Sequence, residues 1–170
     1  MLKIKGKYSL PVIGFLITTV GEKMFVYKRL TEADLSIAKK LVAIFRNQEP
    51  EDEKVLLALA DPYIYIYVAL LDDDVCGYLK AYRLKRIDCE NDFFIIYHIF
   101  VQEKYQRKHI ASDLMKLILE EARAASAYYT FLITQSDNQG AMRLYESLGG
   151  YNHPLNKEVF YWYPEVHPKT

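Results

Sequence analysis

Hydrophobic and polar positions along the chain form blocks that predict a mixed α/β protein. Residues 93–101, FFIIYHIFV, are apolar except for one histidine, which is typical of a strand buried on both faces. Apolar residues then recur at helical spacing from Ile110 to Ala122, which predicts a helix with one buried face. That face comprises Ile110, Leu114, Leu117, Ile118 and Ala122.

Similar patterns predict the other elements. Strands are expected at 24–29, 63–71, 77–84, 128–134 and 157–163, and helices after Thr31, at 54–60 and at 138–148. Thr31 and Asp34 form an imperfect capping box before a helix with an apolar face of Leu35, Ala38, Leu41, Val42 and Phe45. Residues 72–74 suggest a hairpin, and Gly149-Gly150 ends the last helix. This order fits one mixed α/β sandwich.

The first 23 residues need a separate interpretation. Lys3, Lys5 and Lys7 precede an apolar run at 10–17, which superficially imitates a signal peptide. The run is short, ends at two threonines, lacks a following cleavage site and is far too short to span a bilayer. We expect an added edge strand, turned into the next strand by residues 21–23, or an upstream start codon before a true start at Met24.

Composition narrows the possible partners. A length of 170 residues suits one domain, and a formal net charge of zero gives no support for nucleic-acid or membrane-surface binding. Cys76 and Cys89 have neither metal-site spacing nor a disulfide framework, so we expect reduced thiols, no metal and a cytoplasmic location. The sequence leaves open whether the protein forms a homodimer.

Residues 102–109 join the central strand to its helix through a basic turn. Unpaired N–H groups at the helix start, the helix dipole and the side chains of Gln106, Arg107 and Lys108 together predict an anion site. The segment 106–111, QRKHIA, resembles the (Gln/Arg)-x-x-Gly-x-(Gly/Ala) turn of the GCN5-related N-acetyltransferases, which holds the pyrophosphate of coenzyme A. His109 stands at the usual glycine position.

A second motif strengthens this resemblance. Residues 138–149 are similar to a later motif of the family at Asn138, Ala141, Leu144, Tyr145, Leu148 and Gly149. Within the family, residues 96–101 and 107–111 resemble the aminoglycoside 3-N-acetyltransferases of the gentamicin/fortimicin group. The resemblance covers about Met24 to Tyr163, so we assign residues 1–23 to an extension and 24–170 to the acetyltransferase domain. It implies a mixed, mostly antiparallel central sheet flanked by helices.

The resemblance also implies the co-substrate, acetyl-coenzyme A, and its site. The expected cofactor-binding residues are Ile99, Phe100, Val101, Gln106, Arg107, Lys108, His109, Ile110, Ala111, Ser112, Asn138 and Tyr145. Backbone groups of residues 99–101 would contact the pantetheine and the oxyanion, and Asn138 would contact the cofactor or cap its helix. Tyr145 matches the general acid that protonates the departing thiolate, although a helix tyrosine can also simply pack. His109 either crowds the pyrophosphate, because glycine permits closer approach, or adds a donor to it.

His98 interrupts the apolar strand and has two interpretations. It is a buried histidine satisfied by a hydrogen bond, or a base, because a neutral imidazole accepts a proton at physiological pH. The resembled group usually has an aspartate at this position. The histidine therefore weakens the inference that this chain shares the aminoglycoside substrate of that group.

Acidic loops suggest a cationic acceptor. Residues 49–53 and 88–92 carry clustered acids, and the expected substrate-binding residues are Glu51, Asp52, Asp88, Glu90 and Asp92. A solvated loop is the alternative for the first cluster. Three functions remain: acetylation of an aminoglycoside 3-amino group, acetylation of a polyamine or peptide amine, and a non-catalytic module that binds coenzyme A or a partner.

Overall fold

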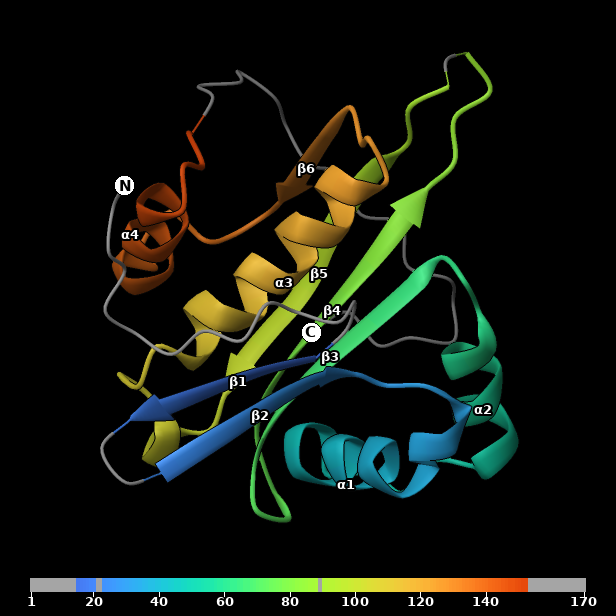
Figure 1. Cartoon of the computed structure of the whole chain (residues 1–170), viewed down its shortest axis with the longest axis vertical. Coiled ribbons are helices and arrows are strands. Elements are labelled where there is room, and N and C mark those ends of the chain that lie inside the picture. The colour runs from blue at the N-terminus through green and yellow to red at the C-terminus, as the bar shows by residue number, and fades with distance from the viewer. Residues whose placement is uncertain (1–14, 21–22, 89, 153–170) are drawn as a thin grey trace, which may run out of the picture. The chain divides into compact units, whose positions relative to one another are not determined.

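A computed structural model describes residues 15–20, 23–88 and 90–152 (Figure 1). The strands are β1 (Phe15–Val20), β2 (Lys23–Arg29), β3 (Ile64–Leu71), β4 (Asp74–Leu84), β5 (Phe93–Val101) and β6 (Tyr129–Leu132). The helices are α1 (Leu35–Arg46), α2 (Asp52–Ala60), α3 (Ile110–Ala124) and α4 (Gln139–Ser147), with 3₁₀ turns η1 (Glu32–Asp34) and η2 (Glu103–Tyr105). The chain forms one compact unit through Gln135 and a second from Ser136 onward, so each is described by itself.

The first unit is built on a six-stranded sheet with the order β1-β2-β3-β4-β5-β6. Neighbours from β1 to β5 are antiparallel, and β6 is parallel to β5 across the α3 crossover. The predicted fold class, a mixed and mostly antiparallel sheet flanked by helices, is confirmed. β1 is an edge strand, while the division into an extension and a domain stays a prediction. The strand predicted at 157–163 and Cys89 lie outside the described residues.

Helices cover both faces of this sheet. On one face, Leu30, Val68, Val75 and Tyr78 pack against Ala38 and Leu41 of α1 and Val55 of α2. Tyr67 precedes Val68, and its hydroxyl donates to Glu121 of α3, so α3 lies on the opposite face. All five residues of the apolar face predicted for α3 are buried.

Two buried tyrosines fix α3 on the sheet. Tyr27 and Tyr67 are 0% exposed, and their hydroxyls donate to Asp113 Oδ2 at 3.3 Å and to Glu121 Oε1 at 2.6 Å. Burial raises the pKa of both phenols, so they stay protonated and keep donating. These bonds satisfy polar groups that would otherwise be costly beneath the helix.

Several local predictions are confirmed. Thr31 caps η1, and its backbone N–H donates to Asp34 Oδ2 at 3.0 Å. Gly149 ends α4 with a φ of 85°, which is the left-handed conformation that glycine favours. Cys76 is a buried free thiol, and burial raises its pKa to about 11. None of the described helices combines the length and apolar character needed to cross a membrane.

The prediction that β5 is buried on both faces is wrong: in its first half one face is buried and the other partly buried, and its second half is more exposed. Phe94 and Ile96 are buried, whereas Tyr97 is 58% exposed and Phe100 is 47% exposed. The reason is that β6 pairs with β5 only from Phe93 to Ile96. Beyond Ile96, the described part of the chain contributes no strand on that side.

Candidate functional site

The site begins at an irregularity in β5. Ala81 of β4 pairs with Ile96, but the preceding Lys80 pairs with His98, so Tyr97 is an extra residue. Such a bulge bends its strand and turns the following side chains. It lies just where β6 stops, and the second half of β5 therefore has β4 as its only strand neighbour among the described residues.

The bulge leaves an open backbone edge. The Gln102 N–H donates to Cys76 O at 2.9 Å, so in the alternating antiparallel pattern Phe100 also directs its peptide groups to β4. Ile99 and Val101 therefore direct theirs to the opposite side, and the Gln106 amide reaches Val101 O there at 3.3 Å. Of the three predicted backbone positions, Ile99 and Val101 face the opening and Phe100 does not.

Close packing fixes the end of β5. A Cβ on Gly77 would lie 2.7 Å from Phe100 O and 3.3 Å from Ile110 Cγ2, so only glycine lets β4, β5 and α3 approach this closely. Tyr105 is buried, and its hydroxyl donates to Asp74 Oδ2 at 2.8 Å. The turn that follows therefore starts from a rigid position.

The basic turn runs from this anchor into α3. Arg107 and His109 both have left-handed backbone conformations, with φ angles of 59° and 62°. The family pattern has glycine at the position of His109, and this φ explains why. Left-handed residues in a turn bring successive N–H groups toward one point, which makes an anion-binding concavity.

Donors gather at the start of α3. Its first intrahelical bond runs from Asp113 N to His109 O, so the N–H groups of Ile110, Ala111 and Ser112 have no partner within the helix. His109 provides no side-chain cap. Arg107 is exposed and forms no ion pair with a described residue, while Lys108 donates to Lys104 O at 2.9 Å. The turn thus presents backbone donors, positive charge and the helix dipole to an anion.

His98 lies on the other face of β5, against α1. Arg46 Nη2 lies 2.9 Å from His98 Nδ1 and 3.1 Å from Nε2. Tyr97 and Phe100 flank the imidazole, with ring centroids 4.3 and 5.7 Å away. Burial, with the charges of Arg46 and Lys80, lowers the pKa of His98 below its ordinary value. His98 is partly buried, and its lowered pKa favours the neutral imidazole.

The second unit carries the other predicted residues. Asn138 caps α4, and its Oδ1 accepts from Ala141 N at 3.1 Å. Tyr145 lies in the last turn of α4, and burial raises its pKa, so its phenol keeps its proton. Its roles as acid or packing residue both stay predictions.

The structure does not bring the predicted acids together. Asp92 is 3% exposed and binds Arg83 Nε at 2.6 Å and Lys85 Nζ at 3.4 Å. Burial acts to raise its pKa, but these cations hold it below the ordinary value. Because Asp92 precedes β5 and His98 lies six residues further on, about 20 Å of extended strand separates them. Asp92 is thus held by two cations of the protein, and its role in substrate binding stays a prediction.

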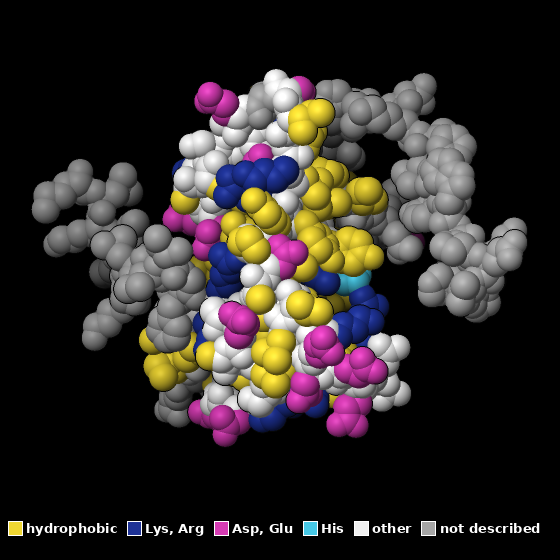
Figure 2. All heavy atoms as spheres, turned by 90° about the vertical axis from the view of Figure 1, so that its right-hand side faces the viewer, with side chains coloured by type: hydrophobic (Ala, Val, Ile, Leu, Met, Phe, Trp, Pro, Cys, Tyr) yellow, Lys and Arg dark blue, Asp and Glu magenta, His cyan; other side chains and the backbone are white. Residues whose placement is uncertain are grey.

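Two further acids are also engaged by cations of the protein. Asp52 accepts from Lys39 at 2.5 Å, and Asp88 accepts from Arg86 Nε at 2.7 Å. Glu51 and Glu90 are exposed, without an ion pair to a described residue. Acidic side chains gather in the lower part of Figure 2, where α1 and α2 lie.

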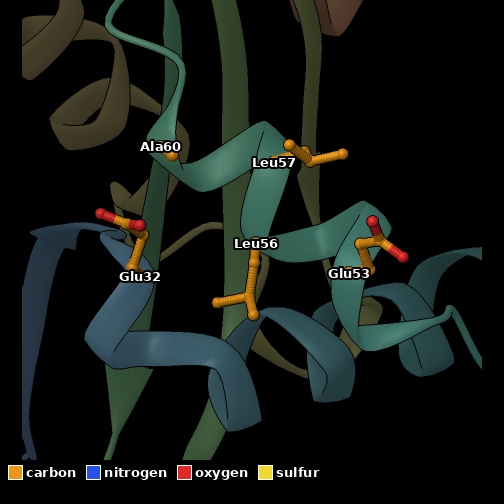
Figure 3. Close-up of a pocket in the computed structure, with 5 residues that line it drawn as sticks. All are labelled: Glu32, Glu53, Leu56, Leu57 and Ala60. Atoms are coloured by element: carbon orange, nitrogen blue, oxygen red, sulfur yellow. The ribbon is translucent and has the colours of Figure 1, made fainter.

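One hollow lies away from these residues. It measures about 320 Å³ and lies between η1 and α2, lined by Glu32, Glu53, Leu56, Leu57 and Ala60 (Figure 3). Its lining contains none of the predicted catalytic or cofactor-binding residues. Within the described ranges, no three His, Cys, Asp or Glu side chains are grouped to hold a metal ion.

The chain matches the acetyltransferase (GNAT) family over residues 33–150. It belongs to this family. No curated protein matches the chain significantly in sequence. The bulged and open β5, the basic turn and α3 are thus the candidate acetyltransferase site.

Solved structures share the fold. An aminoglycoside acetyltransferase from an uncultured soil metagenomic sample has a TM-score of 0.71 at 23% identity, covering 81% of this chain and 99% of that chain. A second one, in complex with sisomicin, has a TM-score of 0.67 at 22% identity, covering 84% and 97%. Ribosomal-protein-alanine N-acetyltransferase from Brucella melitensis biovar Abortus 2308 has a TM-score of 0.64 at 20% identity, covering 81% and 99%. At these identities the likeness shows the fold and not the acceptor.

Sequence reasoning missed two residues beside His98. Arg46 is the last residue of α1, and Lys80 lies directly opposite His98 on β4. Arg46 and His98 are 52 positions apart, so no local pattern signals their contact. The pattern of apolar residues also does not predict the bulge, which determines the face of the strand on which His98 lies.

Proposed function

We propose that the acetyltransferase moves the acetyl group of acetyl-coenzyme A to an amine, with His98 as the base and Tyr145 as the acid. The observation that carries this proposal is the opening at β5, where His98 directly follows the bulge and Ile99 and Val101 direct their peptide groups away from β4. A neutral histidine beside an open strand edge suits proton removal from an ammonium group.

The residues around the turn fit the proposed co-substrate. The N–H groups of Ile110, Ala111 and Ser112, with Arg107 and Lys108, would bind its pyrophosphate. Ile99 and Val101 would pair with the amide groups of its pantetheine arm, as a neighbouring strand would. When bound, acetyl-coenzyme A supplies the thioester carbonyl that the amine attacks.

His98 and Tyr145 would then divide the proton transfers. A ring nitrogen of His98 would accept the proton that the amine loses, and the lowered pKa favours the unprotonated form of this nitrogen. The Tyr145 hydroxyl donates its proton to the departing sulfur, and the raised pKa keeps it protonated until then. A backbone N–H on the open edge of β5 donates to the developing oxyanion.

Two acceptor hypotheses remain within this function. The 3-amino group of an aminoglycoside is supported by the family resemblance and by the exposed acids Glu51 and Glu90. Three of the five predicted acids are already bound to cations of the protein, and this weakens that hypothesis. A polyamine or peptide amine stays the alternative acceptor class.

Release of coenzyme A thiol, measured over a panel of amines, tests the function. We expect turnover with at least one amine, and Tyr145→Phe should lower kcat strongly while the affinity for acetyl-coenzyme A, measured by calorimetry, stays nearly intact. Near wild-type turnover would assign Tyr145 to packing. Tight binding of acetyl-coenzyme A without turnover of any amine would support a non-catalytic binding module instead.

A further inference from the structure

Two positive charges lie beside His98, and neither forms an ion pair with a described acid. Arg46 is exposed and contacts the imidazole and the Tyr78 hydroxyl. Lys80 is partly buried, with its Nζ 5.0 Å from the centre of the Tyr82 ring. No carboxylate of the described residues lies within ion-pair distance of either cation.

Many other cations of the described chain bind carboxylates, as in the pairs Lys28–Asp34, Lys39–Asp52, Arg83–Asp92, Lys104–Asp74, Lys116–Asp113 and Arg123–Glu120. Arg46 and Lys80 share their lack of an ion pair to a described residue with Arg107 and Lys108, but they differ in lying together beside the imidazole. Among the described residues, the titratable groups beside His98 are Arg46, Lys80, Tyr78, Tyr82 and Tyr97, and none of these is a carboxylic acid. Within the described ranges, no carboxylate therefore balances the charge of the two cations at this place.

Shape and chemistry of the surroundings favour a small ligand. Lys80 pairs directly with His98 across the strands, so their Cα atoms are about 5.5 Å apart. Tyr97 and Phe100 expose aromatic surface beside them. Figure 2 shows hydrophobic side chains gathered on this side of the molecule, with both basic and acidic side chains at the border of this area. A ligand placed here would meet aromatic surface, two cations and a neutral imidazole within a few ångströms.

We infer that the acceptor amine also carries an anionic group, a carboxylate or a phosphate, which Arg46 and Lys80 bind while the amine reaches His98. This inference rests on the proposed acetyl transfer. The guanidinium of Arg46 can bind either anion through two hydrogen bonds, and Lys80 adds a point charge. The same charges repel a polycation, so they select against an aminoglycoside amine at His98.

Anion binding can be measured without turnover. The nuclear magnetic resonance signals of the His98 imidazole, identified by their loss in His98→Asn, are followed during titration with acetate and with inorganic phosphate. We expect a saturable shift and a rise of the His98 pKa, because a bound anion stabilises the imidazolium. Both changes should vanish in the Arg46→Met, Lys80→Met double variant and persist in the matched control Arg123→Met, whose cation lies on α3. Absence of a saturable change in the wild-type protein overturns the inference.

Turnover with matched acceptor pairs tests the substrate class. β-Alanine is compared with β-alaninamide, and 2-aminoethyl phosphate with 2-aminoethanol, which separates the carboxylate from the phosphate. We expect kcat/KM to favour the anionic member of at least one pair, and Arg46→Met should lower that preference by about 10-fold or more. A merely structural role of Arg46 would lower both members equally and leave their ratio unchanged.

The outcomes separate this inference from the proposed function. Transfer to neutral amines or to a gentamicin-type aminoglycoside, with no preference for anionic amines, overturns the inference and leaves the acetyltransferase proposal standing. Saturable anion binding at His98 without transfer to any amine supports the anion site and overturns the proposed reaction.

Discussion

The two halves of β5 have nearly the same apolar composition, yet they have different structures. The first half, Phe93 to Ile96, pairs with strands on both sides, and Phe94 is fully buried. The second half, from His98 to Val101, has β4 as its only strand neighbour among the described residues and exposes Phe100. The single extra residue at Tyr97 separates them.

This difference shows how one strand can serve two purposes. The first half contributes to the core, where each buried side chain stabilises the fold. The second half gives up strand pairing and burial, and its peptide groups and His98 become free to contact a ligand. A continuous apolar segment therefore need not be uniformly buried, because burial also depends on whether neighbouring strands pair with it.

The largest expected effect concerns stability on the two sides of the bulge. Phe94→Ala removes a fully buried ring that contacts Tyr65, so we expect it to lower the free energy of unfolding by about 3–5 kcal/mol. Phe100→Ala removes a ring that is 47% exposed and should cost about 1 kcal/mol or less. Urea unfolding followed by circular dichroism measures both. Equal losses would show that the two halves are equally part of the core.

A catalytic effect is expected only beyond the bulge. His98→Asn should lower kcat/KM by about 100-fold or more, because it removes the base. The pKa of His98 is depressed, so wild-type activity should persist below the ordinary imidazole range and fall only as the pH drops through that lowered pKa. Arg46→Met removes a positive charge and should move this limb of the pH profile to higher pH. Retention of rate in the asparagine variant would make His98 a packing residue.

The turn after the second half should govern cofactor affinity. Arg107→Ala should weaken the binding of acetyl-coenzyme A by about 1–3 kcal/mol, because it removes a charged contact with phosphate. Isothermal titration calorimetry measures this change, and Arg123→Ala is the control for loss of a distant exposed arginine. An unchanged affinity for the Arg107 variant would remove this side chain from the site.

The smallest effect is expected from relief of backbone strain in the same turn. His109→Gly should raise the free energy of unfolding by less than about 1 kcal/mol, because a φ of 62° suits glycine better than histidine. His109→Ala keeps the Cβ and should give no gain. Thermal unfolding of the three proteins compares them. Destabilisation by glycine would instead indicate a stabilising contact of the His109 side chain.

Much of the fold was predictable from the sequence because local patterns determine it. The buried face of α3, the cap at Thr31 and the left-handed Gly149 each depend on residues close in sequence. Strand limits were less predictable: β6 covers Tyr129–Leu132, shorter than the predicted 128–134, because pairing with β5 stops at Ile96.

The site was predictable only in its contiguous part. The turn at 106–111 is one segment, so its donors could be identified together. Arg46 and His98 meet across 52 positions, and about 20 Å of extended strand separates Asp92 from His98. The ion pairs of Asp92 with Arg83 and Lys85 were also not predicted, although a buried carboxylate needs compensating charge.

The two tyrosines beneath α3 have a mechanical consequence for the cofactor turn. Asp113 and Glu121 are eight residues apart, so the two hydroxyls attach the helix at points about 12 Å apart along its axis. A shift of one residue would translate the helix by about 1.5 Å and rotate it by about 100°, breaking both bonds. With both bonds in place, α3 can neither translate along its axis nor rotate about it. The sheet therefore determines the position and direction of the helix N-terminus. Substitutions at Tyr67 would then alter the binding of a phosphate group at the N-terminus of α3, although Tyr67 does not contact this group.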